Sequence, residues 1–550
     1  MFRVLPTIRI GALVLAAALS SGAPAADPVV EGRIADLVSG RAGAPLRDVA
    51  PLRDPSWLAQ VYAPAAPGPI WFTNGGTPPA VAAALRELRG AARHGLDAAP
   101  YDTAALRQAV AAASAADATP EAVARADVAL TSAVLQFLSD LRFGRVRPQE
   151  VEPHFRVEAK HAGFVTALRS AVAHDRLATL VAATEPALAL YGRLVLLLAH
   201  YRGLAAQASI VLPGLPPLTT KIVAGDRYAG SGLLHDLLVR LGDLPADGAR
   251  PEGDRYDADL AAGVRRFQSR HGLDADGVLG KQTLAALNVP LATRVAQIEL
   301  SLERLRWLPE LAAGPAIVVN IPSFRLWAFG DAADTQTATL SMPVIVGQAV
   351  RNETPVFVGM MRAVEFSPYW NVPRNILHNE LLPRLARDPG HLQREDMELV
   401  STRGGDAVRT VGAEGLAALR KGDLRLRQRP GTKNALGGVK FVLPNTMEIY
   451  VHGTPARQLF GQTRRDFSHG CIRVRDPEAL AAFVLQGLPE WTPATIATAM
   501  GSGKNRTVAL PRSIPVIVFY TTALVDRAGP ALFLPDVYGH DTKLAAVLRN

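Results

Sequence analysis

The spacing of apolar residues along this chain of 550 residues changes once, near residue 315. Over residues 57–212, alanine- and leucine-rich stretches with polar breaks are typical of helices. Residues 316–329 (AIVVNIPSFRLWAF) and 339–346 instead predict strands, the second interrupted by Pro343. Because the chain is several times longer than one core requires, we expect a multidomain α+β protein with two to four domains.

Proline and glycine residues indicate where these domains are joined. Residues 210–220 contain Pro213, Gly214, Pro216 and Pro217, which suit a stiff connection rather than a helix interior. This boundary predicts a helical domain over residues 27–215 and a compact helical unit over residues 221–290. A connecting amphipathic helix then ends before Pro309.

The strand-rich region after residue 314 is predicted to contain an insertion. Residues 375–430 are polar and weakly helical, and so long a connection inside a compact domain is typical of a lid. The strand pattern resumes at Phe441, and Asp476 begins a predicted helix. We expect the strand-rich domain to cover residues 314–500, with residues 501–550 as a C-terminal extension that packs on the preceding domains.

Residues 1–26 have the pattern of a secretory signal peptide. Arg3 and Arg9 precede an apolar run of about ten residues, and an A-x-A sequence follows at the expected cleavage site. A membrane-spanning helix needs about twenty apolar residues, so export to the periplasm is favoured over an uncleaved inner-membrane anchor. No later segment is expected to span a membrane, and export excludes nucleic acid as a partner.

The chain contains a single cysteine, Cys471. Exported proteins of this size usually have none or an even number, because their cysteines form disulfides. A lone thiol in an oxidising compartment is therefore either used chemically or buried and inert. The net charge of +9 either favours a polyanionic partner such as a carboxylate-rich wall or has no functional meaning.

Two short segments contain the residues that acyl transfer by a thiol requires. Residues 450–454 (YVHGT) end a predicted strand, and residues 468–474 (SHGCIRV) follow a polar loop. The thiol needs a base, and the oxyanion of the tetrahedral intermediate needs backbone donors. Gly470 permits an unusual backbone angle and close approach of a substrate. Spacing alone does not decide whether His452 or His469 is the base.

These segments resemble the L,D-transpeptidase catalytic domain of the YkuD type, in which a histidine precedes an S/T-H-G-C motif. The resemblance implies that His452 is the general base and Cys471 the nucleophile, with the amides of Gly470 and Cys471 as candidate oxyanion donors. Ser468 and His469 then shape the loop. Over most of its length the chain resembles the large YcbB-like L,D-transpeptidases, which share FSPYWNVPRNIL, RPGTKNALGGVKFVLPN and FLPDVYGHD. The sequence VRRFQSRHGLDADGVLGKQT resembles a peptidoglycan-binding module.

The resemblance implies a helical scaffold domain, a small peptidoglycan-binding module and a β-rich catalytic domain with an inserted lid-like subdomain. The implied reaction joins a peptidoglycan tetrapeptide stem, as donor, to a neighbouring stem in a 3→3 cross-link, without a cofactor. The alternatives are an L,D-carboxypeptidase, in which water resolves the thioester, and a non-catalytic peptidoglycan-binding scaffold.

Three further residues are candidates for substrate binding. Arg473 could bind a carboxylate, although a solvated strand charge is an equal alternative. Tyr450 alternates along its strand so as to face the site with His452. Trp370 could line the donor pocket or belong to a core. A zinc site formed by His452, His469 and Cys471 is disfavoured, because the spacing matches no zinc motif, and no metal is expected.

Overall fold

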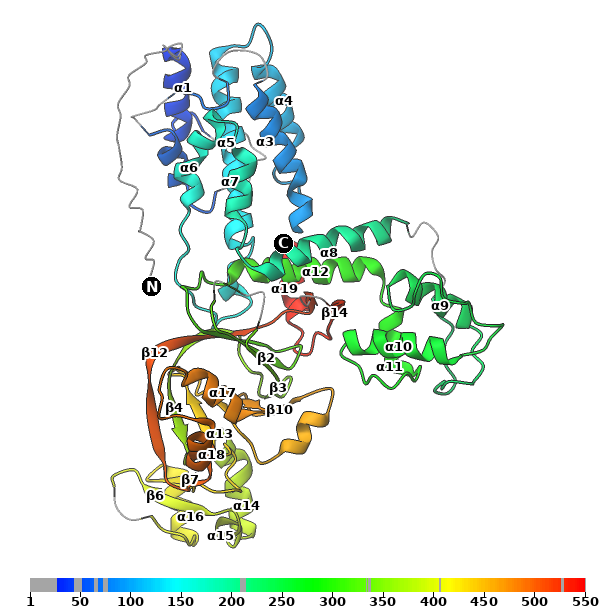
Figure 1. Ribbon diagram of the computed structural model, residues 1–550. Helices are drawn as coiled ribbons and strands as arrows, with labels where there is room; N and C mark the ends of the chain where they lie inside the picture. The colour runs from blue at the N-terminus through cyan, green and yellow to red at the C-terminus, as the bar shows by residue number, and fades with distance from the viewer. Residues whose placement is uncertain are drawn as a thin grey trace, which may run out of the picture. The chain divides into compact units, whose positions relative to one another are not determined.

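The computed structural model describes residues 27–43, 52–63, 68–72, 78–207, 214–332, 334, 338–404, 407–525 and 529–549. The export segment expected at residues 1–26 lies outside these described residues. The chain forms two compact units (Figure 1). The first comprises Met1–Arg89, Ala98–Leu138 and Gly163–Ala183, and the second comprises Gly90–Asp97, Ser139–Ala162 and Thr184–Asn550.

The first unit is helical, as the scaffold prediction requires. A buried carboxylate organises its interior, because Asp127 accepts hydrogen bonds from the Tyr62 hydroxyl at 2.5 Å and from the Trp71 backbone N–H at 2.8 Å. Burial raises the pKa of Asp127. Its helices are α1 (Pro28–Val38), α2 (Ser56–Val61), α3 (Pro79–Arg89), α4 (Ala104–Ala113), α6 (Gly163–Ala173) and most of α5 (Pro120–Phe143) and α7 (Leu177–Thr184).

Helix α5 is long and apolar enough to cross a membrane by length and composition, whereas no segment after residue 26 was expected to be. Within its most apolar window, 78% is buried inside the protein. The core helix of a globular domain satisfies the same criteria, so α5 is weak evidence for a membrane span.

The second unit contains the small helical module expected at residues 221–290. Helices α9 (Ser231–Arg240), α10 (Ala258–Arg270) and α11 (Lys281–Leu287) share a core that includes Val264 and Phe267. Gln268 explains the turn between α10 and α11, since its side chain donates to Val278 O at 3.0 Å and accepts from Gly277 N at 2.8 Å. Helix α12 (Leu291–Trp307) confirms the predicted connecting helix and lies beside α8 (Ala189–Ala206) in Figure 1.

The strand-rich region forms a nine-stranded sheet with the order β10-β3-β11-β9-β8-β4-β12-β1-β2. Strand β2 also pairs with β3, so eight of the strands form a closed ring of pairings around an apolar core. The strands are β1 (Ala316–Asn320), β2 (Arg325–Phe329), β3 (Leu340–Gly347), β4 (Phe357–Phe366), β8 (Val439–Val442), β9 (Val451–His452), β10 (Asp466–Ser468), β11 (Ile472–Val474) and β12 (Arg506–Phe519).

Two expectations about these strands were wrong. Strand β3 continues through Pro343, whose C=O accepts from Arg475 N at 3.2 Å, because a strand tolerates a proline where its missing N–H is not needed. Residues 501–550 are not simply an extension packed on the domain, since β12 lies between β4 and β1 inside the sheet. The helix predicted at Asp476 is confirmed as α17 (Pro477–Val484), with the Asp476 side chain capping its first turn.

The insertion is a small subdomain with its own sheet, rather than a weakly helical stretch. Its strands β5 (Trp370–Asn371), β7 (Leu424–Gln428) and β6 (Met397–Ser401) pair in that order. A separate apolar cluster fills the space between this sheet and the helices. The helical segments are α13 (Arg374–Ile376), the π-helical η4 (Leu377–Leu381), α14 (Leu382–Arg387), α15 (His391–Arg394) and α16 (Ala413–Lys421).

The C-terminal part of the second unit contributes further elements beyond β12. Strands β13 (Ala523–Val525) and β14 (Ala531–Phe533) form a hairpin, and α19 (His540–Arg549) follows it. Four further elements of the second unit precede β12 in the sequence. They are α18 (Pro493–Gly501) and the 3-10 helices η1 (Gly90–His94), η2 (Pro148–Glu150) and η5 (Arg457–Gly461).

Candidate active site

The register of two neighbouring strands brings the candidate base and nucleophile together. Strands β9 and β11 are parallel, with Ile472 opposite Val451 and Arg473 opposite His452. Side chains alternate along a strand, so His452 and Arg473 face the same side of the sheet. Cys471 is the residue immediately before β11, two residues before Arg473.

The same face of the sheet carries charged residues on the next strands. Lys440 on β8 is opposite His452, and Glu365 on β4 is opposite Lys440. Lys440 and Glu365 form an ion pair at 3.6 Å, and Lys440 Nζ lies 4.1 Å from the centre of the Tyr450 ring. The sheet therefore presents His452 and Arg473 within a row of polar and charged side chains.

The Cys471 thiol is half-buried, and its Sγ donates to Glu448 O at 3.6 Å. Burial raises the pKa of this thiol above its ordinary value. The Tyr450 backbone N–H and the positive charges of Arg473 and Lys440 oppose that shift in pKa. The thiol is consequently protonated at neutral pH in the free protein and needs a base to react.

His452 is buried, with only 4% of its surface exposed. Burial, with the positive charge of Arg473 as the next cause, lowers the pKa of His452 to about 3. Its Nδ1 lies 2.5 Å from Gly453 O, and a carbonyl can only accept, so in the neutral ring the proton is on Nδ1. The Leu436 carbonyl is a second backbone acceptor for this ring, and in the neutral Nδ1-protonated form Nε2 is the nitrogen without a proton.

The loop before Cys471 is held by hydroxyl groups. Ser468 Oγ donates to Cys471 O at 2.5 Å and accepts from Gly470 N at 3.1 Å. Thr354 Oγ1 donates to Gly470 O at 2.7 Å. The Gly470 amide is thus already bonded to Ser468, which favours a turn-forming role for Gly470 and leaves the Cys471 amide as the better oxyanion candidate. Gly470 has φ +111°, a conformation that favours glycine.

His469 points to a different neighbour from His452. Its side-chain surface is 33% exposed, and its Nε2 lies 2.6 Å from Glu380 Oε1 of the π-helical segment η4. The insertion therefore contacts, through this pair, the loop of residues 468–471, which is called the catalytic loop below. Sequence reasoning missed Glu380, since 89 residues separate the two partners and no motif marks the contact.

The three substrate-binding candidates separate into two places. Arg473 and Tyr450 lie beside Cys471, and the Arg473 Nε is buried without a hydrogen-bond partner among the described residues. Burial lowers the pKa of Arg473, opposed by the charge of Cys471. Trp370 instead lies on β5 and packs against the apolar cluster of the insertion.

A hollow of about 400 Å³ borders the catalytic loop at His469 and Gly470. Its lining includes Glu152, Glu353 and His540. His540 Nδ1 lies 2.7 Å from Glu152 Oε1, which ties α19 to the segment after η2. Within the described part of the chain, no group of three or more His, Cys, Asp or Glu side chains is arranged to hold a metal ion.

Comparison with known proteins shows three matching families. Residues 314–496 match the "L,D-transpeptidase catalytic domain" of the YkuD family, residues 232–287 match the "Putative peptidoglycan binding domain", and residues 56–198 match a "Scaffold domain". A "Putative L,D-transpeptidase" of Haemophilus influenzae is 31% identical over 302 residues, which cover 54% of this chain and 60% of that protein. The chain thus spans less than two thirds of this relative's length.

Two solved L,D-transpeptidase structures also align with the chain, each at 14% identity. The protein from Stackebrandtia nassauensis has a TM-score of 0.22, covering 58% of this chain and 98% of that one. The protein from Xylanimonas cellulosilytica has a TM-score of 0.17, covering 55% and 100%. At such low TM-scores neither structure adds to the assignment.

The matches define a multidomain chain, with a separate family model for each of three segments. More specifically, it carries a YkuD-type L,D-transpeptidase catalytic domain together with a peptidoglycan-binding domain. The predicted family resemblance and the predicted α+β fold class are confirmed at this level.

Proposed function

We propose that the protein is an L,D-transpeptidase that forms 3→3 cross-links between peptidoglycan stems through a thioester on Cys471. The observation that supports the proposal is the parallel pairing of β9 with β11, in which His452 is opposite Arg473 and Cys471 immediately precedes β11. A thiol, a neutral imidazole and the positive charges of Arg473 and Lys440, which act on both groups, support the proposal. These are the groups that acyl transfer to sulfur requires.

The first half-reaction acylates the cysteine. Nε2 of His452 accepts the thiol proton as Sγ attacks the carbonyl carbon of the third residue in the donor stem. The Cys471 amide and the nearby positive charge of Arg473 favour the oxyanion of the tetrahedral intermediate. Collapse of the intermediate breaks the peptide bond, the imidazolium returns the proton to the leaving amine, and terminal D-Ala departs.

The second half-reaction resolves the thioester. The side-chain amine of a neighbouring stem attacks the acyl carbon, His452 accepts a proton from that amine, and the thiolate leaves and is protonated again. The energy of the cleaved peptide bond is retained in the thioester, so this sequence needs neither ATP nor a cofactor. If water attacks instead, the product is a tripeptide and the protein acts as an L,D-carboxypeptidase.

The proposed substrate implies where the protein works. Peptidoglycan lies outside the cytoplasm, and we propose a periplasmic location reached through residues 1–26 as a signal peptide. The proposed partners are tetrapeptide stems as donors and neighbouring stems as acceptors.

The test is muropeptide analysis after the purified protein has been incubated with tetrapeptide-rich peptidoglycan. We expect dimers linked 3→3 from the wild type and none from Cys471→Ala or His452→Ala. Tripeptides without dimers would support the carboxypeptidase instead. A covalent adduct after carbapenem exposure, seen by mass spectrometry and lost in Cys471→Ala, is also expected; an unmodified wild type that is inactive on peptidoglycan would favour the scaffold.

A further inference from the structure

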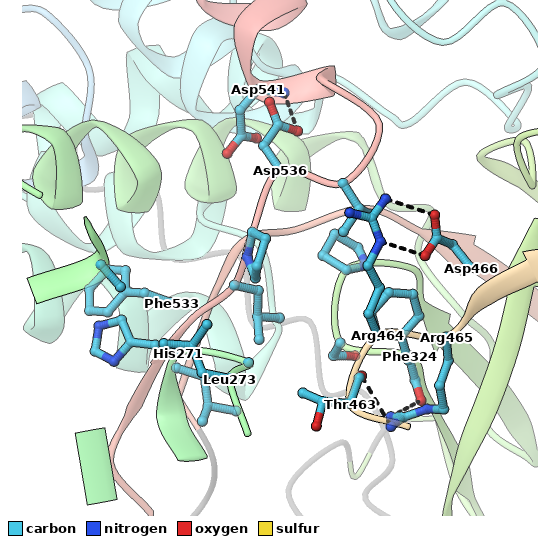
Figure 2. A pocket seen from close by; sticks show the side chains of 18 of the residues that line it. His271, Leu273, Phe324, Thr463, Arg464, Arg465, Asp466, Phe533, Asp536 and Asp541 are labelled. Atoms are coloured by element: carbon cyan, nitrogen blue, oxygen red, sulfur yellow. Dashed lines mark hydrogen bonds and ion pairs between the residues drawn. The ribbon is translucent and has the colours of Figure 1, made fainter. Parts of the chain in front are cut away.

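A groove of about 2000 Å³ lies within the second unit, apart from the face that carries Cys471 (Figure 2). His271 and Leu273 of the peptidoglycan-binding domain line one side of it, and Arg465 of the catalytic domain lines the other. Thr463 donates a hydrogen bond to Asp274, which joins the two domains across the groove. The groove is therefore formed jointly by the binding domain and the catalytic domain.

The charged side chains that line this groove differ in whether they have partners inside the protein. They are six arginines and four aspartates, with no lysine or glutamate. Each aspartate already has a partner inside the protein: Asp466 pairs with Arg464, Asp541 with Arg304, Asp536 with the Tyr520 hydroxyl, and Asp274 with Thr463. Asp536 and Asp274 accept hydrogen bonds from hydroxyl groups and keep their charge, so the positive sign of the groove comes from the excess of six arginines over four aspartates.

Only Arg464 among these six arginines forms an ion pair with a carboxylate of the described residues, and Arg325, Arg351 and Arg465 are among the five that form none. Arg325 is exposed, and its Nε donates to Ser341 Oγ at 2.8 Å. Arg351 is exposed as well. Arg465 is held by backbone carbonyls, including Val344 O at 3.2 Å, and burial together with the charge of Arg325 lowers its pKa to about 10. Neighbouring cations without counter-ions favour an anionic ligand.

Aromatic side chains lie among the arginines. Trp327, Phe460 and Phe467 line the groove and are each half-buried, so part of each ring faces the open space. A surface that alternates cations with apolar ring faces suits a polymer whose carboxylates alternate with flat, less polar units. A glycan that carries peptide stems has this chemistry.

The groove adjoins the hollow behind the catalytic loop. The turn after β3 separates the two, because Arg351 lines the groove and Glu353 lines the hollow. Helix α19 separates them too, since Asp541 lines the groove and His540 lines the hollow. A strand lying in the groove would thus end next to the loop that holds Gly470.

We propose that this groove is a binding site for a carboxylate-bearing glycan–peptide strand, held between the peptidoglycan-binding domain and the catalytic domain. The polymer's identity rests on the proposed function, whereas the site itself rests on the groove and its unpaired arginines. The groove holds the strand while the stem that reacts reaches Cys471, so it contributes to binding of polymeric peptidoglycan and not to the chemical step.

The experiment uses the full-length chain with Cys471→Ala, so that turnover does not complicate binding. Arg325→Glu with Arg351→Glu is compared with Arg420→Glu plus Arg512→Glu, two exposed arginines that do not line the groove. In co-sedimentation with insoluble peptidoglycan we expect the groove pair to weaken binding about tenfold and the control pair to leave it unchanged. Equal losses in both pairs, or no loss in the groove pair, would overturn the proposal.

A second measurement separates this proposal from the proposed function. In a protein that retains Cys471, the variant with Arg325→Glu and Arg351→Glu should cross-link insoluble peptidoglycan more slowly than the wild type. It should still react with a carbapenem at the wild-type rate. An enzyme that proves inactive on every substrate would refute the proposed function and leave the binding result standing. If the glutamate pair lowers the thermal midpoint, Arg325→Gln with Arg351→Gln provides the same comparison, with a smaller expected loss.

Discussion

At the scale of single residues, burial moves the pKa values of Cys471 and His452 in opposite directions. The thiol pKa is raised, and the imidazole pKa falls to about 3. The proton therefore stays on sulfur in the free protein, and both groups are neutral at pH 7. A thiolate–imidazolium pair is not formed in advance, so thiolate formation has to accompany the attack on the substrate.

This charge state predicts how the lone cysteine responds to pH. Alkylation of Cys471 by iodoacetamide, followed by intact-protein mass spectrometry, should rise with pH with a midpoint above that of an ordinary cysteine. Lys440→Met should move the midpoint further up, because it removes a positive charge that favours the thiolate. A midpoint near neutrality would show instead that a thiolate pair exists before the substrate binds.

The buried imidazole also predicts a dependence of stability on pH. The folded pKa of His452 is about 3 against an ordinary value of 6.5, so the unfolded chain binds a proton that the folded chain excludes. Its contribution is present above pH 6.5 and is lost as pH falls towards 3, by an amount on the order of a few kcal/mol. The thermal midpoint of His452→Gln should thus fall less between pH 7 and pH 5 than that of the wild type. Equal falls would contradict this assignment.

The backbone angle at Gly470 predicts that replacing this glycine lowers both the stability of the protein and its reaction with a carbapenem. An alanine Cβ would lie 3.1 Å from Ile449 Cδ1, at a φ of +111° that alanine rarely adopts. Gly470→Ala should cost about 1–3 kcal/mol of unfolding free energy, measured by urea denaturation, and should slow carbapenem acylation strongly because the loop before Cys471 shifts. Gly461→Ala, on an open part of the same region with nothing within 4 Å, is the control. Acylation at the wild-type rate in Gly470→Ala would refute the need for this backbone angle.

The sequence predicted Cys471 and His452 because a local motif carries them, and it left the other contacts of the site open. Whether Gly470 N–H stays available as a donor depends on how the Ser468 hydroxyl turns, which only the folded loop determines. Trp370 was offered as either a pocket or a core residue, and it packs with the apolar cluster of the insertion, which its neighbours in sequence do not indicate.

At the scale of elements, predictions succeeded where a pattern was local. Helix α17 begins at a capping aspartate followed by proline, and both signals act within one turn. Apolar and polar residues alternate in strand β7 (LRLRQ), as they do in a half-buried strand. Its arginines nevertheless favoured the prediction of a polar, weakly helical insertion. Strand pairing brings together residues far apart in sequence, so the position of β12 beside β1 could not be read from either segment alone.

The contact between Glu380 and His469 predicts that η4 is held against the catalytic loop. Glu380→Gln should weaken this pair, and amide hydrogen exchange in residues 374–387 should become faster than in the wild type. Glu414→Gln, an exposed change on α16 of the same insertion, should leave that exchange unchanged. Unchanged exchange in Glu380→Gln would mean that other contacts hold the segment in place.

At the scale of the whole molecule, the catalytic domain extends beyond its family match. That match ends at residue 496, whereas β12 begins at Arg506 and forms the link between β4 and β1. A fragment of residues 290–500 would expose the facing edges of both neighbours and lose buried side chains such as Val516 and Val518.

We therefore expect the fragment of residues 290–500 to be insoluble or to lack a cooperative thermal transition by circular dichroism. A fragment of residues 214–550 retains β12, the binding domain and α19, and should unfold cooperatively and form the carbapenem adduct on Cys471. Both fragments contain His452, Cys471 and the whole insertion, so the comparison tests what residues 214–289 and 501–550, including β12, add to the sheet. A cooperative, carbapenem-reactive 290–500 fragment would mean that β4 and β1 do not need β12 to keep the sheet together, and that the core fills the gap in another way.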